Sequence, residues 1–367
     1  MSSHLVGVFP ENYIMRRYVL WFVIVLVIIL RYIVTRPNFP QGKLIRITEK
    51  VSSEPTRFEK YQSLRLSGIK IYLPLYPEIN YGDMVVVEGR VEGNKLRSPK
   101  LIDKRDGGGL YALRQKLLAF YSHAFPRPHS SLVAGTVIGS KAGISQQFWD
   151  KLKTTGTAHI VVASGMNVTL VAGFLINALV LWLPRKRAVS ITLIGIWLYS
   201  LFSGFDAPIV RAAIMASITF TAQLYGRIYS AGRALLLSAV AMLIIKPVWI
   251  IDLGFGLSFV ATGSLVLFQK RLTKLLSRVP AFLREDLATT LAAQIGVAPI
   301  LYVYFGQFNP LSPIINALVL WTVPPITIIG MVAGTIGLLI PVLGTAVLYI
   351  AYPLSFWFVS TINLFAH

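Results

Sequence analysis

The sequence predicts a polytopic α-helical membrane protein with about 9–11 transmembrane helices and a small extracytoplasmic β domain near its N-terminus. Of the 367 residues, 55% are hydrophobic and 14% are charged, whereas about a quarter are charged in an average globular chain. The mean hydropathy of +0.65 exceeds what one core can hide, which excludes a soluble enzyme and a disordered chain. The absence of Cys excludes disulfides, thiolate zinc sites and Cys nucleophiles.

Residues 1–36 are predicted to form an N-terminal membrane anchor. Arg16 and Arg17 precede an apolar run, Tyr18–Leu30, which spans a bilayer if Arg31 snorkels to the interface. The alternative is a cleaved signal peptide, because a basic segment precedes the run. No small-x-small cleavage site follows it, so we favour an uncleaved anchor.

Residues 37–106 alternate between polar and apolar side chains and are predicted to form a β domain outside the membrane. Gly82–Asp83 and Gly93–Asn94 supply turn signals. About five short strands in a segment of this length favour an OB-like β-barrel, and an SH3-like barrel is the alternative. The clearest predicted strands are Lys43–Ile47, Leu64–Leu66, Ile69–Tyr72 and Met84–Glu92.

Residues 107–130 are predicted to join this domain to the membrane. Three consecutive glycines, 107–109, form a hinge or linker. Leu110–Phe125 then has apolar residues at helical spacing, with Arg114 and Lys116 on the other side. This pattern is typical of an amphipathic helix on the membrane surface.

Residues 131–367 are predicted to form a helical membrane domain. Pro299 and Pro310 are among several prolines that suggest interrupted helices, which membranes tolerate inside protein or beside water-filled paths. The predicted spans are His159–Leu183, Ala188–Gly204, Ala207–Tyr225, Ala234–Ile251, Leu253–Gln269, Leu287–Phe305, Ser312–Ile329 and one or two more between Met331 and Phe365.

The basic residues of this domain predict its orientation. Ten of the 15 lie in the loops that follow the first, third and fifth spans, so these loops share one face. The positive-inside rule makes that face cytoplasmic, and Arg16 and Arg17 independently place the N-terminus on the same side. The first helix therefore exits the cytoplasm, and the β domain is extracytoplasmic.

Five sequence stretches carry a resemblance to a known family. They are Val133–Ile144 (VAGTVIGSKAGI), Thr155–Val168 (TGTAHIVVASGMNV), Pro208–Met215 (PIVRAAIM), Asp252–Phe259 (DLGFGLSF) and Asn309–Asn316 (NPLSPIIN). In this order and spacing they resemble the competence domain of ComEC-type competence proteins. The resemblance runs from about Val133 to Pro325, and the preceding anchor, OB-like domain and amphipathic helix match the usual family layout.

The resemblance implies a bacterial inner-membrane channel that moves single-stranded DNA into the cytoplasm during natural transformation. We expect no enzymatic activity, cofactor or metal. No ATP-binding GxxxxGK[ST] motif is present, so movement would need a cytoplasmic ATPase or helicase. The implied partners are single-stranded DNA, membrane lipid, an outside DNA receptor and a separate nuclease, and a homo-oligomer is left open.

Three departures from the family pattern bear on this expectation. Asn167 stands where the family usually has His, and Gly256 where it has Gln. Polar hydrogen bonding survives at Asn167, whereas protonation or metal binding there is put in doubt. Larger members carry a C-terminal metallo-β-lactamase-like domain, but no His-x-His-x-Asp-His cluster exists here, so we expect no nuclease in this polypeptide.

Arg211 is the principal candidate residue of the membrane domain, because it lies in an otherwise uncharged predicted span. A cation there should face protein or water, and a DNA phosphate is the functional partner. Pairing with Asp206 or snorkelling is the structural alternative. Asp252 and Lys246 flank a turn, where mutual pairing is the simplest interpretation. The candidates along the DNA path are Arg211, Ser164, Gly165, Asn167, Lys246 and Asn316, with Asp206, Asp252 and Ser258 in support.

Ser164, Gly165 and Asn167 lie within an apolar run. Gly permits close helix approach, and Ser or Asn hydrogen-bonds across helices. Ser164 is a poor nucleophile, since His159 lies five residues away and off its face. Helix packing or a broken helix lining a cavity is favoured over catalysis.

Basic residues in the β domain alternate with Tyr61, Tyr72, Tyr76 and Tyr81. OB-folds bind single strands through such mixtures, whereas a solvated surface attracted to anionic lipid is the alternative. The candidates for DNA binding in this domain are Lys43, Arg46, Arg65, Lys70, Arg90, Lys95, Arg97 and Lys100.

Two other functional classes fit the sequence. A carrier for a small anionic or lipidic solute would also use broken helices and Arg211. A non-transporting membrane scaffold would dock partners through its outer β domain.

Overall fold

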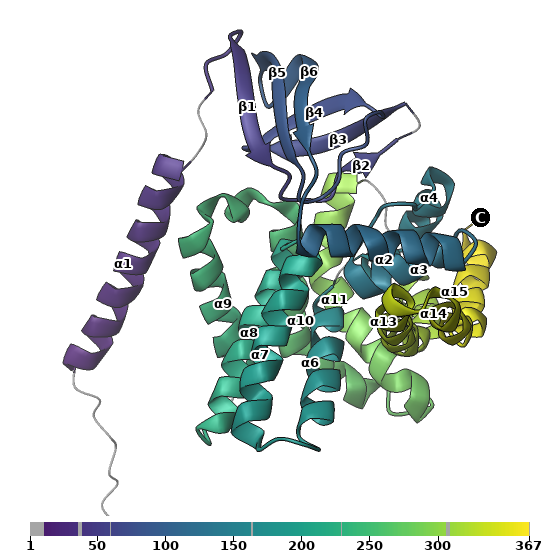
Figure 1. Cartoon of the computed structure of the whole chain (residues 1–367). Coiled ribbons are helices and arrows are strands. Elements are labelled where there is room, and N and C mark those ends of the chain that lie inside the picture. Colours follow the sequence, from purple (N-terminus) through teal and green to yellow (C-terminus); the bar gives the residue numbers. More distant parts are fainter. Residues whose placement is uncertain are drawn as a thin grey trace, which may run out of the picture.

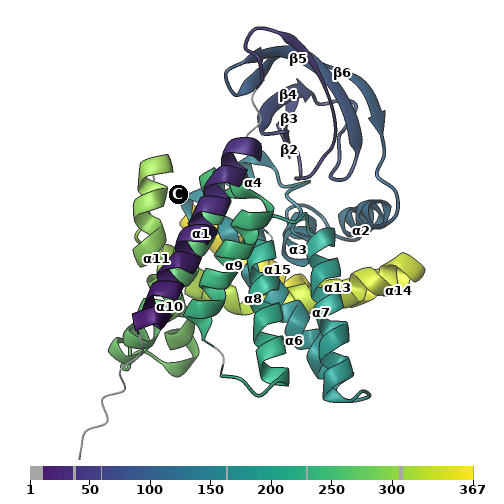
Figure 2. The same ribbon diagram turned by 90° about the vertical axis from the view of Figure 1, so that its left-hand side faces the viewer.

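The computed structural model of the chain describes residues 11–35, 39–58, 60–162, 164–228, 230–305 and 309–366. A β-sheet lies at one end of a group of helices, and helix α1 (Glu11–Thr35) stands beside that group (Figure 1). The α6–α7 turn, the α8–α9 connection and the first turn of α1 lie at the end away from the sheet in both views (Figures 1 and 2).

The β domain is a six-stranded sheet with the order β1-β5-β6-β4-β3-β2. All neighbouring strands are antiparallel except β4 and β6, which are parallel. Alternate side chains of β5 are buried, as expected for strands with one face on a core. The strands are β1 (Leu44–Lys50), β2 (Thr56–Arg57), β3 (Tyr61–Leu66), β4 (Ile69–Pro74), β5 (Met84–Glu92) and β6 (Lys95–Arg105).

The four clearest strand predictions are confirmed as β1, β3, β4 and β5, but the closed barrel is not. In the described part of the chain, β1 and β3 come into contact without a ladder between them. The inward-facing residues nevertheless form one core, in which four residues have 0% exposure: Leu66, Ile71, Val85 and Val87. The buried apolar core is therefore continuous across the domain, whereas the backbone hydrogen bonding is interrupted between β1 and β3.

Helix α2 (Leu110–Ala124) follows the glycine linker, as predicted. It packs on α13, where the Tyr121 hydroxyl donates to the carbonyl oxygen of Gly330 at 2.9 Å. A β-carbon at Gly334 would lie 2.2 Å from the same hydroxyl, so the two helices need glycine at this crossing. The predicted polar face is wrong at Arg114, which is 1% exposed, because this side chain pairs with Glu54 of the β domain.

Thirteen further α-helices and two 3₁₀ turns, η1 and η2, complete the described fold. A central core joins α2, α3, α13 and α15 through residues such as Leu132, Val323, Ile326 and Phe358. The elements are α3 (His129–Ile138), α4 (Gln146–Thr154), α5 (Ala158–Val161), α6 (Gly165–Leu179), α7 (Arg185–Phe202), α8 (Ala207–Leu224), α9 (Ala231–Ile245), η1 (Pro247–Ile251), α10 (Leu253–Leu275), α11 (Ala281–Phe305), α12 (Ser312–Val319), η2 (Leu320–Thr322), α13 (Val323–Leu339), α14 (Pro341–Tyr349) and α15 (Tyr352–Phe365).

Fewer helices reach membrane-spanning length than the sequence predicts. Among the described residues, four helical segments are long and apolar enough to cross a membrane, or up to five if the bent α14–α15 pair is one span. The predicted span His159–Leu183 is broken into α5 and α6, and α6 has 15 residues. At 1.5 Å per residue such a helix is several ångström shorter than a hydrocarbon core of about 30 Å.

Several of the prolines predicted to interrupt helices lie instead in the first turns of helices. Pro313 and Pro324 occupy the first turns of α12 and α13, where a missing N–H costs no hydrogen bond. The predicted interruption at Pro299 is wrong, because α11 continues through it to Phe305.

Candidate functional site

The α5–α6 break is the centre of the candidate site. Helix α5 ends at Val161, and α6 begins at Gly165 after Ser164 in an extended conformation. The Ser164 hydroxyl donates to Oδ1 of Asn167 at 3.4 Å, and no side chain caps the first turn of α6. The N–H groups at a helix start carry partial positive charge, so this break presents an end that attracts anions.

Arg211 of α8 reaches the start of α6. A β-carbon at Gly165 would lie 2.8 Å from its Nη2, so the guanidinium fits there because residue 165 is glycine. Its Nη1 donates to the carbonyl oxygen of Ser258 and to Oγ1 of Thr262, both on α10. The predicted alternative of an Asp206 pair is not formed in the described residues. Arg211 therefore bridges α6, α8 and α10.

A buried polar group lies in the first turn of α6 and on the neighbouring α7. Asn167 has 0% exposure, and its Nδ2 makes no hydrogen bond within the described chain. The Tyr199 hydroxyl faces Asn167 and Ser203, and the hydroxyls of both Tyr199 and Ser203 also lack partners among the described atoms. Buried polar atoms without partners are costly, so such a group in a native fold requires an explanation.

Three contributors to this site escaped the sequence analysis: Thr262, Tyr199 and Ser203. Thr262 lies four residues after Ser258, on the same face of α10, so helical spacing from a named candidate could have found it. Tyr199 and Ser203 lie in an apolar helix end that carries no motif, and only the packing of α7 on α6 brings Tyr199 to Asn167.

Asn316 occupies a second polar contact. It is 1% exposed on α12, and its Nδ2 donates to Oγ of Ser312 at 3.3 Å. A β-carbon at Gly156 would lie 2.3 Å from that same hydroxyl, so the α4–α5 connection packs directly on α12. None of the hydrogen bonds of Asn316 in the described residues reaches Arg211.

The remaining candidates of the helical part have local roles. Lys246 is exposed at the end of α9, with its Nζ 5.4 Å from the ring centroid of Trp249. Asp252 caps α10 by accepting the N–H of Phe255 at 2.9 Å. The predicted Lys246–Asp252 pair is therefore replaced by a cation–π contact and a helix cap.

The outer-domain candidates all lie exposed on or beside the sheet. Arg65 is opposite Lys70, and Lys70 is opposite Lys95, so three basic side chains form a row across β3, β4 and β6. The others are spread over β1, β5 and β6, at Lys43, Arg46, Arg90, Arg97 and Lys100, and Arg97 lies 3.8 Å from Glu92.

Aromatic rings extend this basic row. Phe58 stacks on Tyr61 with centroids 4.5 Å apart, and Tyr61 meets Tyr72 edge-on at 5.7 Å. Lys70 and Lys95 lie 5.1 and 5.9 Å from the centroid of Tyr72. The hydrogen bond from Lys70 lowers the pKa of the Tyr72 hydroxyl below its ordinary value. We define the β3–β4 patch as Arg65, Lys70 and Lys95 with Phe58, Tyr61 and Tyr72.

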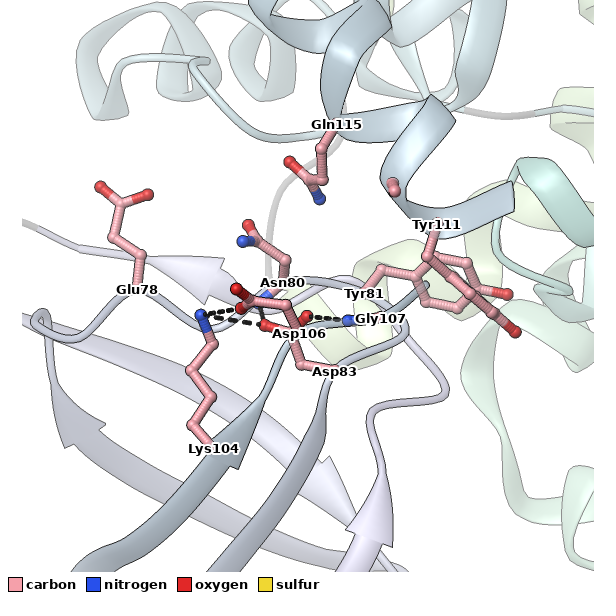
Figure 3. Close-up of a pocket in the computed structure, with 10 residues that line it drawn as sticks. Glu78, Asn80, Tyr81, Asp83, Lys104, Asp106, Gly107, Tyr111 and Gln115 are labelled. Atoms are coloured by element: carbon pink, nitrogen blue, oxygen red, sulfur yellow. Dashed lines mark hydrogen bonds and ion pairs between the residues drawn. The ribbon is translucent and has the colours of Figure 1, made fainter. Parts of the chain in front are cut away.

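A cavity of about 480 Å³ lies between the β domain and α2 (Figure 3). Asp83 and Asp106 hold the Lys104 ammonium at 3.3 and 2.7 Å, and Glu78 also lines the space. Burial lowers the pKa of Lys104, but Asp106 and Asp83 outweigh it and raise that pKa overall. With three carboxylates against one ammonium, the cavity repels phosphate. No group of three or more metal-ligating side chains occurs in the described part of the chain.

Comparison with known proteins covers the part that holds this helical site. The family model described as "Competence protein" matches residues 136–367. The fold defines a mainly helical protein in which an arginine lies at a break between two helices. The family match shows that the chain belongs to the Competence protein family. The match includes Gly165, Arg211 and Thr262 and excludes the β domain.

Three curated relatives were found at low identity. ComE operon protein 3 of Bacillus subtilis (strain 168) is 26% identical over 226 residues, covering 61% of this chain and 29% of the relative. Uncharacterized protein YcaI of Escherichia coli (strain K12) is 25% identical over 58% of this chain and 30% of its own length. Competence protein ComA of Neisseria gonorrhoeae is 24% identical over 55% and 30%. The alignments thus cover less than a third of each relative, and no solved structure matches the chain.

Proposed function

We propose that this chain forms a channel for single-stranded DNA across the bacterial inner membrane during natural transformation. Membership in the Competence protein family supports a role in DNA uptake, as do two relatives named for competence. The site that we propose for DNA contact is the α5–α6 break, because the Arg211 guanidinium lies there, within the region matched by the family.

In the proposed channel, Arg211 contacts the phosphate backbone of the passing strand. Its guanidinium lies next to the positive end of α6, and both attract an anion. A phosphate contact does not depend on base identity, which suits a channel that admits any sequence. Asn167, in the first turn of the same helix, has a further donor without a partner among the described atoms. Non-helical backbone of this kind is tolerated in a membrane where protein or water surrounds it.

The proposed orientation places the N-terminus in the cytoplasm and the β domain outside. The α6–α7 turn and the α8–α9 connection, which are flanked by basic residues at the starts of α7 and α9, lie at the end of the molecule opposite the sheet, which agrees with the positive-inside rule (Figures 1 and 2). Four apolar helical segments of sufficient length support a membrane location.

The β domain is proposed to receive the strand as an OB-like module. Its strand order, with β4 and β6 parallel, supports that class of fold. The β3–β4 patch combines the exposed ring of Tyr61 and the half-buried rings of Phe58 and Tyr72 with ammonium and guanidinium groups, the mixture that binds single strands by stacking and charge. An outside DNA receptor, a separate nuclease and a cytoplasmic ATPase or helicase complete the proposed system.

Deletion of the gene in a competent host tests the channel. We expect transformation to be lost while DNA still binds at the cell surface, because receptor binding precedes transport. Arg211→Ala and Arg211→Lys should both reduce uptake, since neither residue offers a forked guanidinium. Unimpaired transformation after deletion would contradict the proposal and favour a solute carrier or a scaffold. Wild-type uptake by Arg211→Ala would assign Arg211 to helix packing alone.

A further inference from the structure

A carboxylate of the β domain is held by three groups of the helical part. Glu54, in the segment between β1 and β2, accepts the Ser140 hydroxyl at 2.6 Å and the Lys141 backbone N–H at 2.7 Å. Both donors lie in the α3–α4 loop. The Arg114 guanidinium of α2 lies 3.4 Å from Oε2 and 3.5 Å from Oε1 of the same carboxylate. One side chain therefore joins the β domain to two separate elements.

The burial of these groups makes the contact selective for a carboxylate. The side chains of Arg114 and Glu54 are 2% and 14% exposed, and Ser140 has 0% exposure. The groups that contact the Glu54 carboxylate, those of Arg114, Ser140 and Lys141, are all donors, so a cationic side chain at position 54 would leave donors unsatisfied and a neutral one would leave the guanidinium without its anion. A guanidinium buried without its anion is strongly destabilising, so the ion pair and the docked arrangement support each other.

Two further contacts limit rotation about this point. The Tyr81 hydroxyl of the β domain donates to the carbonyl oxygen of Leu201 on α7 at 3.1 Å, and its ring lies 5.4 Å from the Arg114 guanidinium. At the linker, the Gly107 N–H donates to Oδ1 of Asp83 at 3.0 Å (Figure 3). The first linker glycine is therefore held against the sheet.

We propose that Glu54 is the docking carboxylate of the β domain, and that Arg114, Ser140 and Lys141 form its receptor on the helical part. This receptor holds the domain in one orientation, and with it the β3–β4 patch, relative to the helices. The inference concerns the arrangement of the two parts and stands whether or not the chain transports DNA.

The natural absence of Cys allows a direct measurement of this orientation. Spin labels at Asn94→Cys, in the β5–β6 turn, and Gln147→Cys, on α4, report the distance between the two parts in the full chain. We expect one narrow distance in the parent protein. Glu54→Gln and Arg114→Met should each raise the population at other distances by about a hundredfold, because each leaves a buried group without its partner.

Glu49→Gln is the matched control. Glu49 also accepts a serine hydroxyl, that of Ser67 at 2.7 Å, but inside the β domain. We expect this variant to keep the parent distance. An unchanged distance in both Glu54→Gln and Arg114→Met would overturn the proposal, as would equal broadening in Glu49→Gln.

A milder variant covers the case in which these substitutions prevent folding. Ser140→Ala removes one donor and leaves the ion pair. We therefore expect a population at other distances that is smaller than in Glu54→Gln or Arg114→Met, and a far-ultraviolet circular dichroism spectrum like that of the parent protein. The exchange Glu54→Arg with Arg114→Glu should fail to restore the parent distance, because the half-buried Lys141 N–H cannot accept a hydrogen bond from a guanidinium and would lose its partner. Restoration by the exchange would show a simple charge pair and contradict the receptor.

Discussion

At the scale of single residues, Arg211 shows how a predicted site changes once its neighbours are known. The sequence predicts an isolated cation that requires a partner, and the structure supplies Ser258 and Thr262 of α10 together with Gly165 of α6. Its Nε remains unpartnered among the described atoms, so the helices do not satisfy the whole guanidinium. The residue therefore serves packing and leaves part of its donor capacity free.

Gly165→Ala tests the space that Arg211 occupies. The new β-carbon would lie 2.8 Å from Nη2, so the guanidinium must move. We expect transformation to fall about tenfold, in line with the cost of overpacking a close contact. The measurement is transformation frequency, normalised to chain abundance by immunoblot.

Gly173→Ala, in the same helix, is the control for this substitution. A β-carbon there meets nothing within 4 Å, and the substitution is chemically the same. If the two variants transformed equally well, the position of the Arg211 guanidinium at the start of α6 would have no part in uptake.

At the scale of elements, strand register builds the β3–β4 patch from residues that are separated in sequence. Lys70 and Lys95 meet because β4 and β6 pair in parallel, and both then approach Tyr72. Alternation predicts that such residues face solvent, but the row itself follows from the strand order. The patch joins charge to stacking in one place.

Tyr61→Ala combined with Tyr72→Ala should weaken binding of a fluorescent oligothymidine to the detergent-solubilised chain by about tenfold or more, since each stacked base contributes about 1–3 kcal/mol. Fluorescence anisotropy measures the dissociation constant. Tyr225→Ala is the control, because Tyr225 is 76% exposed and lies outside the sheet. Equal affinity of the double variant and the control would exclude the patch as a binding surface.

At the scale of the whole molecule, the orientation of the two ends is testable with single cysteines. Asn94→Cys, in the β domain, should react with a membrane-impermeant maleimide added to intact spheroplasts. Leu181→Cys, at a position that is 77% exposed in the α6–α7 turn, should react only after the membrane is permeabilised. Labelling of Leu181→Cys from outside would contradict the proposed topology.

The strands of the β domain and the start of α2 were predictable because they depend on alternation, turn residues and helical spacing within short windows. The sequence predicts one long span across the end of α5 at Val161 and the start of α6 at Gly165, since apolar composition alone does not report where a backbone leaves the helix. Helical spacing predicts a polar face for Arg114, and it does so because the partner of this residue, Glu54, lies 60 positions away in sequence. Long-range pairing of charges has no local signal.

The Glu54 receptor also has a consequence for how the chain is assembled during synthesis. All ladders of the sheet lie between residues 44 and 105, whereas Arg114, Ser140 and Lys141 follow later in the chain. Because a chain emerges from its N-terminus at about 5–20 residues per second, the β domain can fold before its receptor exists. Docking is then a late step of biogenesis. A chain whose later helices fail to insert would display a folded but undocked domain, with Glu54 open to solvent.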